Sequence, residues 1–213
     1  MKSLFKTIAA AALALLAVAA PASAKDIARM MAVFSDNPVA PKVAPKGYDV
    51  TIVEYFDYAC PYCKAMQPVF DNLVAKDRKV RVVYRDWPIL RPESRIAARL
   101  AIASQWQDRH AAFHDALLGL PGHLTEDGIR SSARSAGVDW ARLEADEKAH
   151  SAEIDALMAE TERHANLLRL QGTPALLVGD HLLRGAVDLA TLQRVVATVR
   201  AEQHAKDGAA GTT

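Results

Sequence analysis

The fold of this chain is decided by residues 50–63, which read VTIVEYFDYACPYC. The first half of this stretch is rich in β-branched and aromatic residues, which predicts a strand buried on both faces. The stretch ends with the chain's two cysteines, Cys60 and Cys63, and apolar residues at helical spacing follow them. We therefore expect Cys60 at the N-terminus of a helix, with Pro61 at the first helical position, where a proline loses no backbone hydrogen bond.

A second β-branched segment, at residues 80–85, completes a strand–helix–strand unit. Such a unit implies two parallel strands joined by a right-handed crossover. The rest of the chain is predicted to contain helices throughout residues 92–168, a hairpin with strands 175–178 and 181–184, and a last helix from Asp188 to about Ala201.

The beginning of the chain has the pattern of a secretion signal. Lys2 and Lys6 precede an almost unbroken apolar run from Ile8 to Ala20, and Ala22-Ser23-Ala24 offers an A-x-A cleavage site. The apolar run is short for a membrane span, and its small-residue end favours cleavage over anchoring. We therefore expect an exported protein.

The charge balance argues against two classes of partner. The formal net charge is +1 over 213 residues, and loss of Lys2 and Lys6 with a signal peptide would leave the chain close to neutral. Such a balance provides no electrostatic basis for nucleic acid or an anionic membrane as the main partner.

A chemical role is a better interpretation of the Cys60-Pro61-Tyr62-Cys63 motif than a structural role. A disulfide between these cysteines would close a very small loop and would remove little entropy from the unfolded chain. The alternatives to a redox-active dithiol are a structural disulfide and an incidental pair. Because a helix N-terminus stabilises a thiolate, we predict Cys60 as the exposed, acidic nucleophile and Cys63 as the shielded resolving thiol.

The motif and several other segments of this chain resemble those of a known protein family. A CPYC after a buried strand, Gly172-Thr173-Pro174-Ala175 before a late strand, and a long helical stretch between them are similar to thioredoxin-fold proteins with the helical insertion of the DsbA group. Further segments resemble the periplasmic DsbA-like proteins of the ScsC/Com1 type: residues 51–54, Asp57-Tyr58, Lys64, residues 85–90 (RDWPIL) and Gly172-Thr173-Pro174. The CPYC alone is weak evidence, since glutaredoxins share it, but the combination is specific and covers about residues 48–201.

The resemblance implies an α/β protein of the periplasm, with a thioredoxin fold that carries a large all-helical insertion. The predicted organisation is a signal peptide at residues 1–24, a helix and Pro-rich linker at 25–47, a thioredoxin-fold domain at 48–90 and 169–203, an inserted helical domain at 91–168 and a disordered tail at 204–213.

The resemblance also implies roles for further residues. Pro174 would be a cis-proline that faces the cysteines, and Thr173 would offer backbone hydrogen bonds to an extended substrate peptide; the alternative is a plain turn proline. Glu54 matches a buried acid that assists proton transfer at the second cysteine, although a strand carboxylate alone is usually solvated or paired. Pro61 and Tyr62 form the dipeptide that tunes the redox potential. Tyr62 lacks the cationic imidazole that DsbA has there, so weaker thiolate stabilisation is expected.

Two histidines are candidate metal ligands. His110 and His114 are four residues apart on a predicted helix, which is a spacing that can hold a metal ion. No third ligand follows at a convincing spacing, so we expect a solvated helix face, no bound metal and no cofactor.

Together these features predict a periplasmic thiol–disulfide oxidoreductase that exchanges a Cys60–Cys63 disulfide with cysteines of exported proteins. The alternatives are a disulfide isomerase or reductase, and a Cu(I)-binding copper-tolerance protein of the ScsC type, because two thiolates at this spacing can hold Cu(I). The resemblance implies a membrane redox partner, either a DsbB-like oxidant or a DsbD/ScsB-like reductant. Residues 25–47 offer too few apolar positions for a lasting coiled coil, so we expect a monomer in which Met30, Met31 and Phe34 pack onto their own domain.

Overall fold

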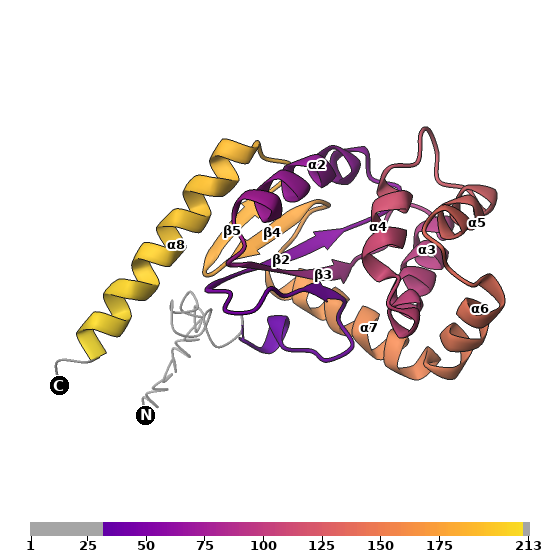
Figure 1. The fold of residues 1–213 in the computed structure, drawn as a ribbon, viewed down its shortest axis with the longest axis horizontal. Coiled ribbons are helices and arrows are strands. Elements are labelled where there is room, and N and C mark those ends of the chain that lie inside the picture. The colour runs from indigo at the N-terminus through magenta and orange to yellow at the C-terminus, as the bar shows by residue number, and fades with distance from the viewer. Residues whose placement is uncertain (1–31, 211–213) are drawn as a thin grey trace, which may run out of the picture.

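Residues 32–210 are described by the computed structural model (Figure 1). The predicted signal peptide and most of the predicted N-terminal helix lie outside these residues, and the expectations for them stay predictions. Within the described residues, no helix is both long and apolar enough to cross a membrane.

A mixed sheet of five strands, in the order β1-β3-β2-β4-β5, forms the centre of the molecule. The strands are β1 (Lys42–Val43), β2 (Val50–Phe56), β3 (Val80–Asp86), β4 (Ala175–Val178) and β5 (His181–Arg184). β2 and β3 run parallel in register from the Val50–Val80 pair to the Phe56–Asp86 pair, and the other neighbours are antiparallel. The predicted strand–helix–strand unit and the predicted hairpin are therefore confirmed.

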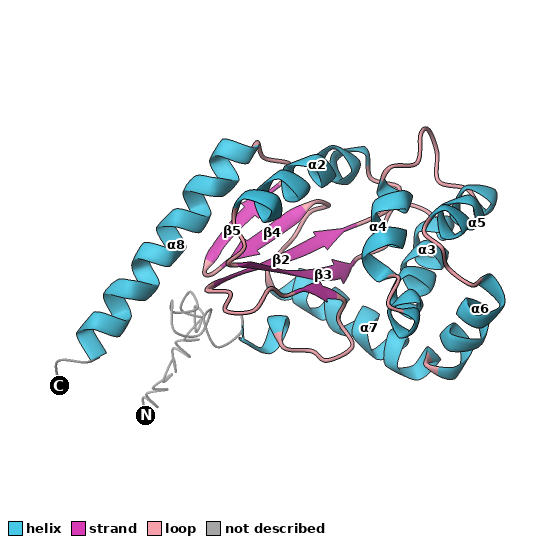
Figure 2. Cartoon of the chain, in the orientation of Figure 1, coloured by secondary structure: helices cyan, strands magenta, loops and turns pink. Residues whose placement is uncertain are grey.

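Helices cover both faces of this sheet (Figure 2). α2 (Pro61–Lys76) and α8 (Leu189–Ala210) pack against each other on one face, whereas α7 (Ser151–Leu167) lies against β3 on the other. The other helices gather beyond the ends of β2 and β3: α3 (Pro92–Ala103), the 3₁₀ helix η1 (Ser104–Gln107), α4 (His110–Leu118), α5 (Glu126–Ser135) and α6 (Trp140–Ala149). The predicted α/β fold with a large helical insertion is confirmed.

The last helix is longer than the sequence predicts. Asp188 caps it as expected, since its Oδ1 accepts a hydrogen bond from the Thr191 backbone N–H at 2.7 Å. The helix then continues to Ala210 instead of ending near Ala201. Residues 204–210, predicted as the start of a disordered tail, thus belong to this helix, and the prediction for residues 211–213 stays a prediction.

A buried cation joins the sheet to α7. The Arg85 guanidinium on β3 lies 2.9 Å from Oε1 of Glu160 on α7, and its Nε donates to the Phe34 carbonyl at 3.1 Å. Phe34 itself is buried and packs against the ring of His164. This confirms the expectation that Phe34 packs onto its own domain; Met30 and Met31 lie outside the described residues.

Candidate active site

Cys60 is the N-cap residue of α2, and Pro61 takes the first helical position. The Cys60 backbone N–H donates to the Asp57 carbonyl at 3.0 Å, which fixes the loop between β2 and α2. The Cys60 thiol donates in turn to the Thr173 carbonyl, with an Sγ···O distance of 3.3 Å. Cys63 lies one turn further along and is fully buried. Only 3 % of Cys60 is exposed, so the expectation of a well exposed nucleophile is wrong, because the loop at Thr173 covers the thiol.

The two thiols differ strongly in acidity. A hydrogen bond from the Cys63 thiol, helped by Thr173 and by the backbone N–H groups of Tyr62 and Cys63, outweighs burial and lowers the pKa of Cys60 to about 6. Burial, and to a smaller degree the hydrogen bond that the Cys63 thiol donates to Cys60, raises the pKa of Cys63 well above its usual value. At neutral pH the pair therefore favours a thiolate on Cys60 and a proton on Cys63.

The loop before β4 forms one wall of a groove beside the cysteines. The Thr173–Pro174 peptide is cis, as the resemblance implies, and the Pro174 carbonyl accepts a hydrogen bond from the Gly185 N–H at 2.9 Å. Tyr62, at the start of α2, is 64 % exposed. The groove has a volume of about 350 Å³ and is lined by Tyr62, residues 170–175, Arg184 and Gly185. It can accommodate an extended segment of another chain.

Glu54 lies on β2 and is completely buried. Its Oε2 has no hydrogen-bond partner among the described residues. Burial, followed by the nearby charges of Asp86 and Cys60, raises the pKa of Glu54 to about 8. Glu54 is therefore mainly protonated at neutral pH.

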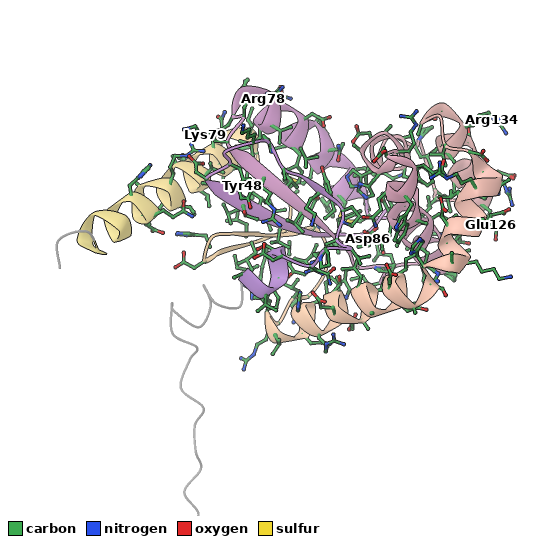
Figure 3. All side chains as sticks on the ribbon, turned by 60° about the horizontal axis from the view of Figure 1, so that its bottom comes forward. Tyr48, Arg78, Lys79, Asp86, Glu126 and Arg134 are labelled. Carbon is green, nitrogen blue, oxygen red and sulfur yellow. The ribbon has the colours of Figure 1, made fainter. Side chains whose placement is uncertain are left out.

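Asp86, at the end of β3, is a second buried acid, and the sequence pattern assigns it no role. Neither oxygen of its carboxyl group has a hydrogen-bond partner within residues 32–210, and the side chain lies in the packed interior (Figure 3). Burial, and to a smaller degree the charge of Asp57, raises the pKa of Asp86 to about 8. Its position two residues before Pro88 gives no hint of this environment, because its burial follows from the packing of the folded chain.

Asp57 is buried too, but its carboxylate is fully satisfied. Oδ1 accepts the backbone N–H of Ala59 at 2.7 Å, and Oδ2 accepts those of Ile89 and Leu90 at 2.9 Å each. One carboxylate therefore holds the loop that carries Cys60 against the segment that follows β3. Asp57 was part of the resemblance, but only the structure reveals this bracing contact.

The two histidines on α4 are not on a solvated face, which corrects the expectation. His114 is fully buried, and its Nδ1 lies 3.0 Å from the Tyr58 hydroxyl. His110 is also buried, and both rings pack against Tyr84. Burial lowers the pKa of His110 to about 3 and holds that of His114 well below its usual value, so both rings are neutral. The helical pattern alone could not show that this face of α4 points into the core.

Comparisons with known proteins agree with this geometry. A thioredoxin-like oxidoreductase from Silicibacter pomeroyi DSS-3 has a similar structure, with a TM-score of 0.75 and 40% sequence identity over 79% of this chain and 96% of that one. The catalytic domain of Proteus mirabilis ScsC shares the fold at 23% identity, with a TM-score of 0.74 over 84% of this chain and 98% of that one. The thiol:disulfide interchange protein DsbA of Bordetella parapertussis is 27% identical over 85% of this chain and 86% of its own length.

A different type of relative matches this chain over only a part of its own length. The Na(+)/H(+) antiporter NhaA 1 of Salinispora arenicola is 29% identical over 76% of this chain but only 24% of its own length. This chain therefore spans about a quarter of the antiporter it matches. Residues 51–197 match the family model described as DSBA-like thioredoxin domain. The chain thus belongs to the family of DSBA-like thioredoxin domains, with a Cys60-Pro61-Tyr62-Cys63 motif at the N-terminus of α2.

Proposed function

We propose that this protein is a periplasmic thiol–disulfide oxidoreductase that exchanges a Cys60–Cys63 disulfide with cysteines of exported proteins. The observation that carries the proposal is the contrast between the two thiols: the pKa of Cys60 is lowered to about 6, whereas that of Cys63 is raised. A thiolate that is stable at neutral pH is a good leaving group, so the disulfide passes readily to another protein.

In the oxidising direction, a substrate thiolate attacks Sγ of Cys60 in the disulfide. A bond forms between the substrate sulfur and Cys60, the Cys60–Cys63 bond breaks, and its electron pair leaves on Cys63. Cys63 takes up a proton because burial holds its pKa high, and Glu54 is the donor, since its own pKa of about 8 keeps it protonated. Glu54 thus acts as the buried acid of the site.

In the second step, another substrate thiolate attacks the substrate sulfur of the mixed disulfide. The substrate disulfide forms, and Cys60 leaves as a thiolate, which the N-terminus of α2 stabilises. Two electrons have then passed from the substrate to the protein. A DsbB-like membrane oxidant would remove these electrons, whereas a DsbD/ScsB-like reductant would supply electrons for the reverse reaction.

The groove beside Thr173 and Pro174 is the proposed substrate site. The Thr173 carbonyl now accepts the Cys60 thiol proton, and this contact is available only while Cys60 is protonated. Once Cys60 is a thiolate or forms a mixed disulfide, the Thr173 backbone can instead bind an extended peptide. Pro61 and Tyr62 form part of the surface next to the Cys60 sulfur and tune the redox potential of the disulfide.

Export is supported by the charged start, apolar run and A-x-A site of the first 24 residues. The packing of Phe34 within its own chain supports a monomer. We therefore assign the protein strong dithiol-oxidising and weak isomerase activity.

Refolding of reduced ribonuclease tests the proposal, and scrambled ribonuclease tests the isomerase alternative. The oxidised protein should restore ribonuclease activity from the reduced form, and Cys60→Ala should abolish this. Rapid unscrambling with poor oxidation would identify an isomerase. Titration of the reduced protein with Cu(I) tests the copper alternative: tight stoichiometric binding without ribonuclease oxidation would favour it over thiol exchange.

A further inference from the structure

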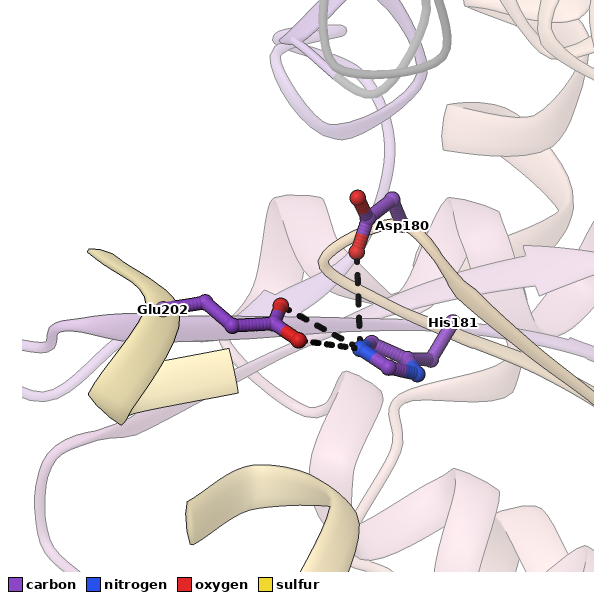
Figure 4. Close-up of side chains that lie close together, drawn as sticks. All are labelled: Asp180, His181 and Glu202. Atoms are coloured by element: carbon purple, nitrogen blue, oxygen red, sulfur yellow. Dashed lines mark hydrogen bonds and ion pairs between the residues drawn. The ribbon is translucent and has the colours of Figure 1, made fainter. Parts of the chain in front are cut away.

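Three side chains converge at the end of the β4–β5 hairpin that is remote from the cis-proline loop. Asp180 lies in the hairpin turn, His181 begins β5, and Glu202 projects from α8 (Figure 4). The His181 Nε2 lies 3.3 Å from each carboxylate oxygen of Glu202 and 3.5 Å from Oδ1 of Asp180. One ligand atom from each residue fits within 4.8 Å of the others.

These separations are long for hydrogen bonds between charged groups, which typically measure about 2.7–2.9 Å. The two nitrogen–oxygen separations at His181 match the edges of a coordination tetrahedron, and the ligand oxygens of Asp180 and Glu202 lie within 4.8 Å of each other. Zinc–nitrogen and zinc–oxygen bonds of about 2.0–2.2 Å place neighbouring ligand atoms roughly 3.3–3.6 Å apart. The nitrogen–oxygen distances of 3.3 and 3.5 Å around His181 lie in that interval.

Packing holds the three donors in place. Gly179 has a φ of +57°, and a Cβ atom at this position would lie 2.8 Å from Cγ1 of Val199. The hairpin turn therefore lies directly against α8 at a buried valine. Val199 is one helical turn before Glu202, so the same close contact that fixes the turn also brings Glu202 next to His181.

The donor set indicates the kind of ion. One imidazole nitrogen and two carboxylates suit a borderline divalent cation, and three protein ligands leave a fourth position for water. We propose that Asp180, His181 and Glu202 form a binding site for a divalent transition-metal ion of the zinc type. The bound ion joins the β4–β5 turn to the C-terminal half of α8, away from the cysteines.

Zinc titration tests this site directly, provided that the cysteines cannot bind the metal. A Cys60→Ser/Cys63→Ser background removes the thiolate ligands. Competition with a chromophoric zinc chelator at pH 7.5 should then reveal one Zn²⁺ per chain. His181→Ala and Glu202→Gln should each weaken binding at least tenfold, whereas His204→Ala, an exposed histidine on the same helix, should not.

Thermal unfolding provides a second readout in the same background. Zn²⁺ should raise the Tm, because a ligand that binds only the folded state stabilises it, and Glu202→Gln should remove the rise. Because Glu202→Gln keeps the size of the side chain, the test does not depend on the folding of the histidine variant. Absence of stoichiometric binding, or equal loss in His204→Ala, would overturn the site. Thiol exchange by the wild-type cysteines is measured without zinc, so failure of this site leaves the proposed oxidoreductase unaffected.

Discussion

Cys60 and Cys63 are the same side chain in two environments that are one helical turn apart. Cys60 receives hydrogen bonds at the end of α2, whereas Cys63 is enclosed by the core. The spacing of the motif alone predicts which thiol is acidic, because the positions of the helix end and the proline follow from it. The degree of burial of Cys60 does not follow from it, because the covering carbonyl comes from Thr173, far along the chain.

The first prediction concerns the acidity of Cys60. Because its pKa is lowered to about 6, the rate of iodoacetamide alkylation of the reduced protein should rise with a midpoint near pH 6. Mass spectrometry of the digested protein should find the label on Cys60 before Cys63. A midpoint near the ordinary thiol value, or equal labelling of both cysteines, would disprove the assignment.

The second prediction concerns the buried acid Glu54. Its folded-state pKa is raised to about 8 from an ordinary value of 4.5. A group whose folded-state pKa is raised in this way stabilises the folded protein fully below its ordinary pKa. This stabilisation is lost as pH rises through the folded-state pKa. The free energy of unfolding should therefore fall between about pH 4.5 and 8, by up to about 1.4 kcal/mol per pH unit for this proton.

Glu54→Gln removes the titrating proton while keeping the shape of the side chain. Urea unfolding of the oxidised variant should show a shallower decline over this pH interval and greater stability than the wild type near pH 8. Glu153→Gln, at an exposed position, is the control. It should leave the pH dependence of the unfolding free energy unchanged. An unaltered slope in Glu54→Gln would mean that Glu54 is already ionised at neutral pH.

At the scale of elements, the third prediction is that the N-terminus of α2 contributes to an oxidising redox potential. A stabilised Cys60 thiolate favours the reduced form, so equilibration with glutathione should yield a potential of about −120 to −200 mV. Tyr62→His would add a cationic imidazole next to the thiolate. We expect it to shift the potential upward by tens of mV, while Tyr62→Phe should change it little. A wild-type potential near −270 mV, or equal shifts in both variants, would contradict this account.

The fourth prediction concerns the attachment of α7 to the sheet. Glu160→Gln leaves the Arg85 charge buried without its carboxylate partner. We expect a loss of about 2–3 kcal/mol in urea unfolding, less than for a fully buried pair because the Glu160 side chain is 22% exposed. Glu153→Gln on the same helix removes a solvated contact and should cost less than about 0.5 kcal/mol. Equal losses of unfolding free energy in both variants would show that the ion pair of Arg85 with Glu160 adds no stability.

At the scale of the whole molecule, the sequence predicts most of the local structure and part of the site. The strands predicted at 50–56 and 80–85, the hairpin and the cap at Asp188 follow from residue type and spacing. The burial of His114 and Asp86 does not, because it depends on helices that meet only in the folded chain. The contact of α7 with β3 is unpredictable for the same reason: it joins distant segments, as in the pair of Arg85 with Glu160, which are 75 positions apart.

The most direct test of the account is the capture of a substrate by one cysteine variant and not by the other. Reduced Cys63→Ala and reduced Cys60→Ala would each be mixed with a peptide that carries an activated disulfide at neutral pH, and intact-protein mass spectrometry would follow the adducts. We predict rapid formation of a stable mixed disulfide on Cys60 in Cys63→Ala, and little reaction of Cys63 in Cys60→Ala. Comparable adduct formation in both variants, or faster reaction in Cys60→Ala, would contradict the central claim that Cys60 is the exchanging thiol.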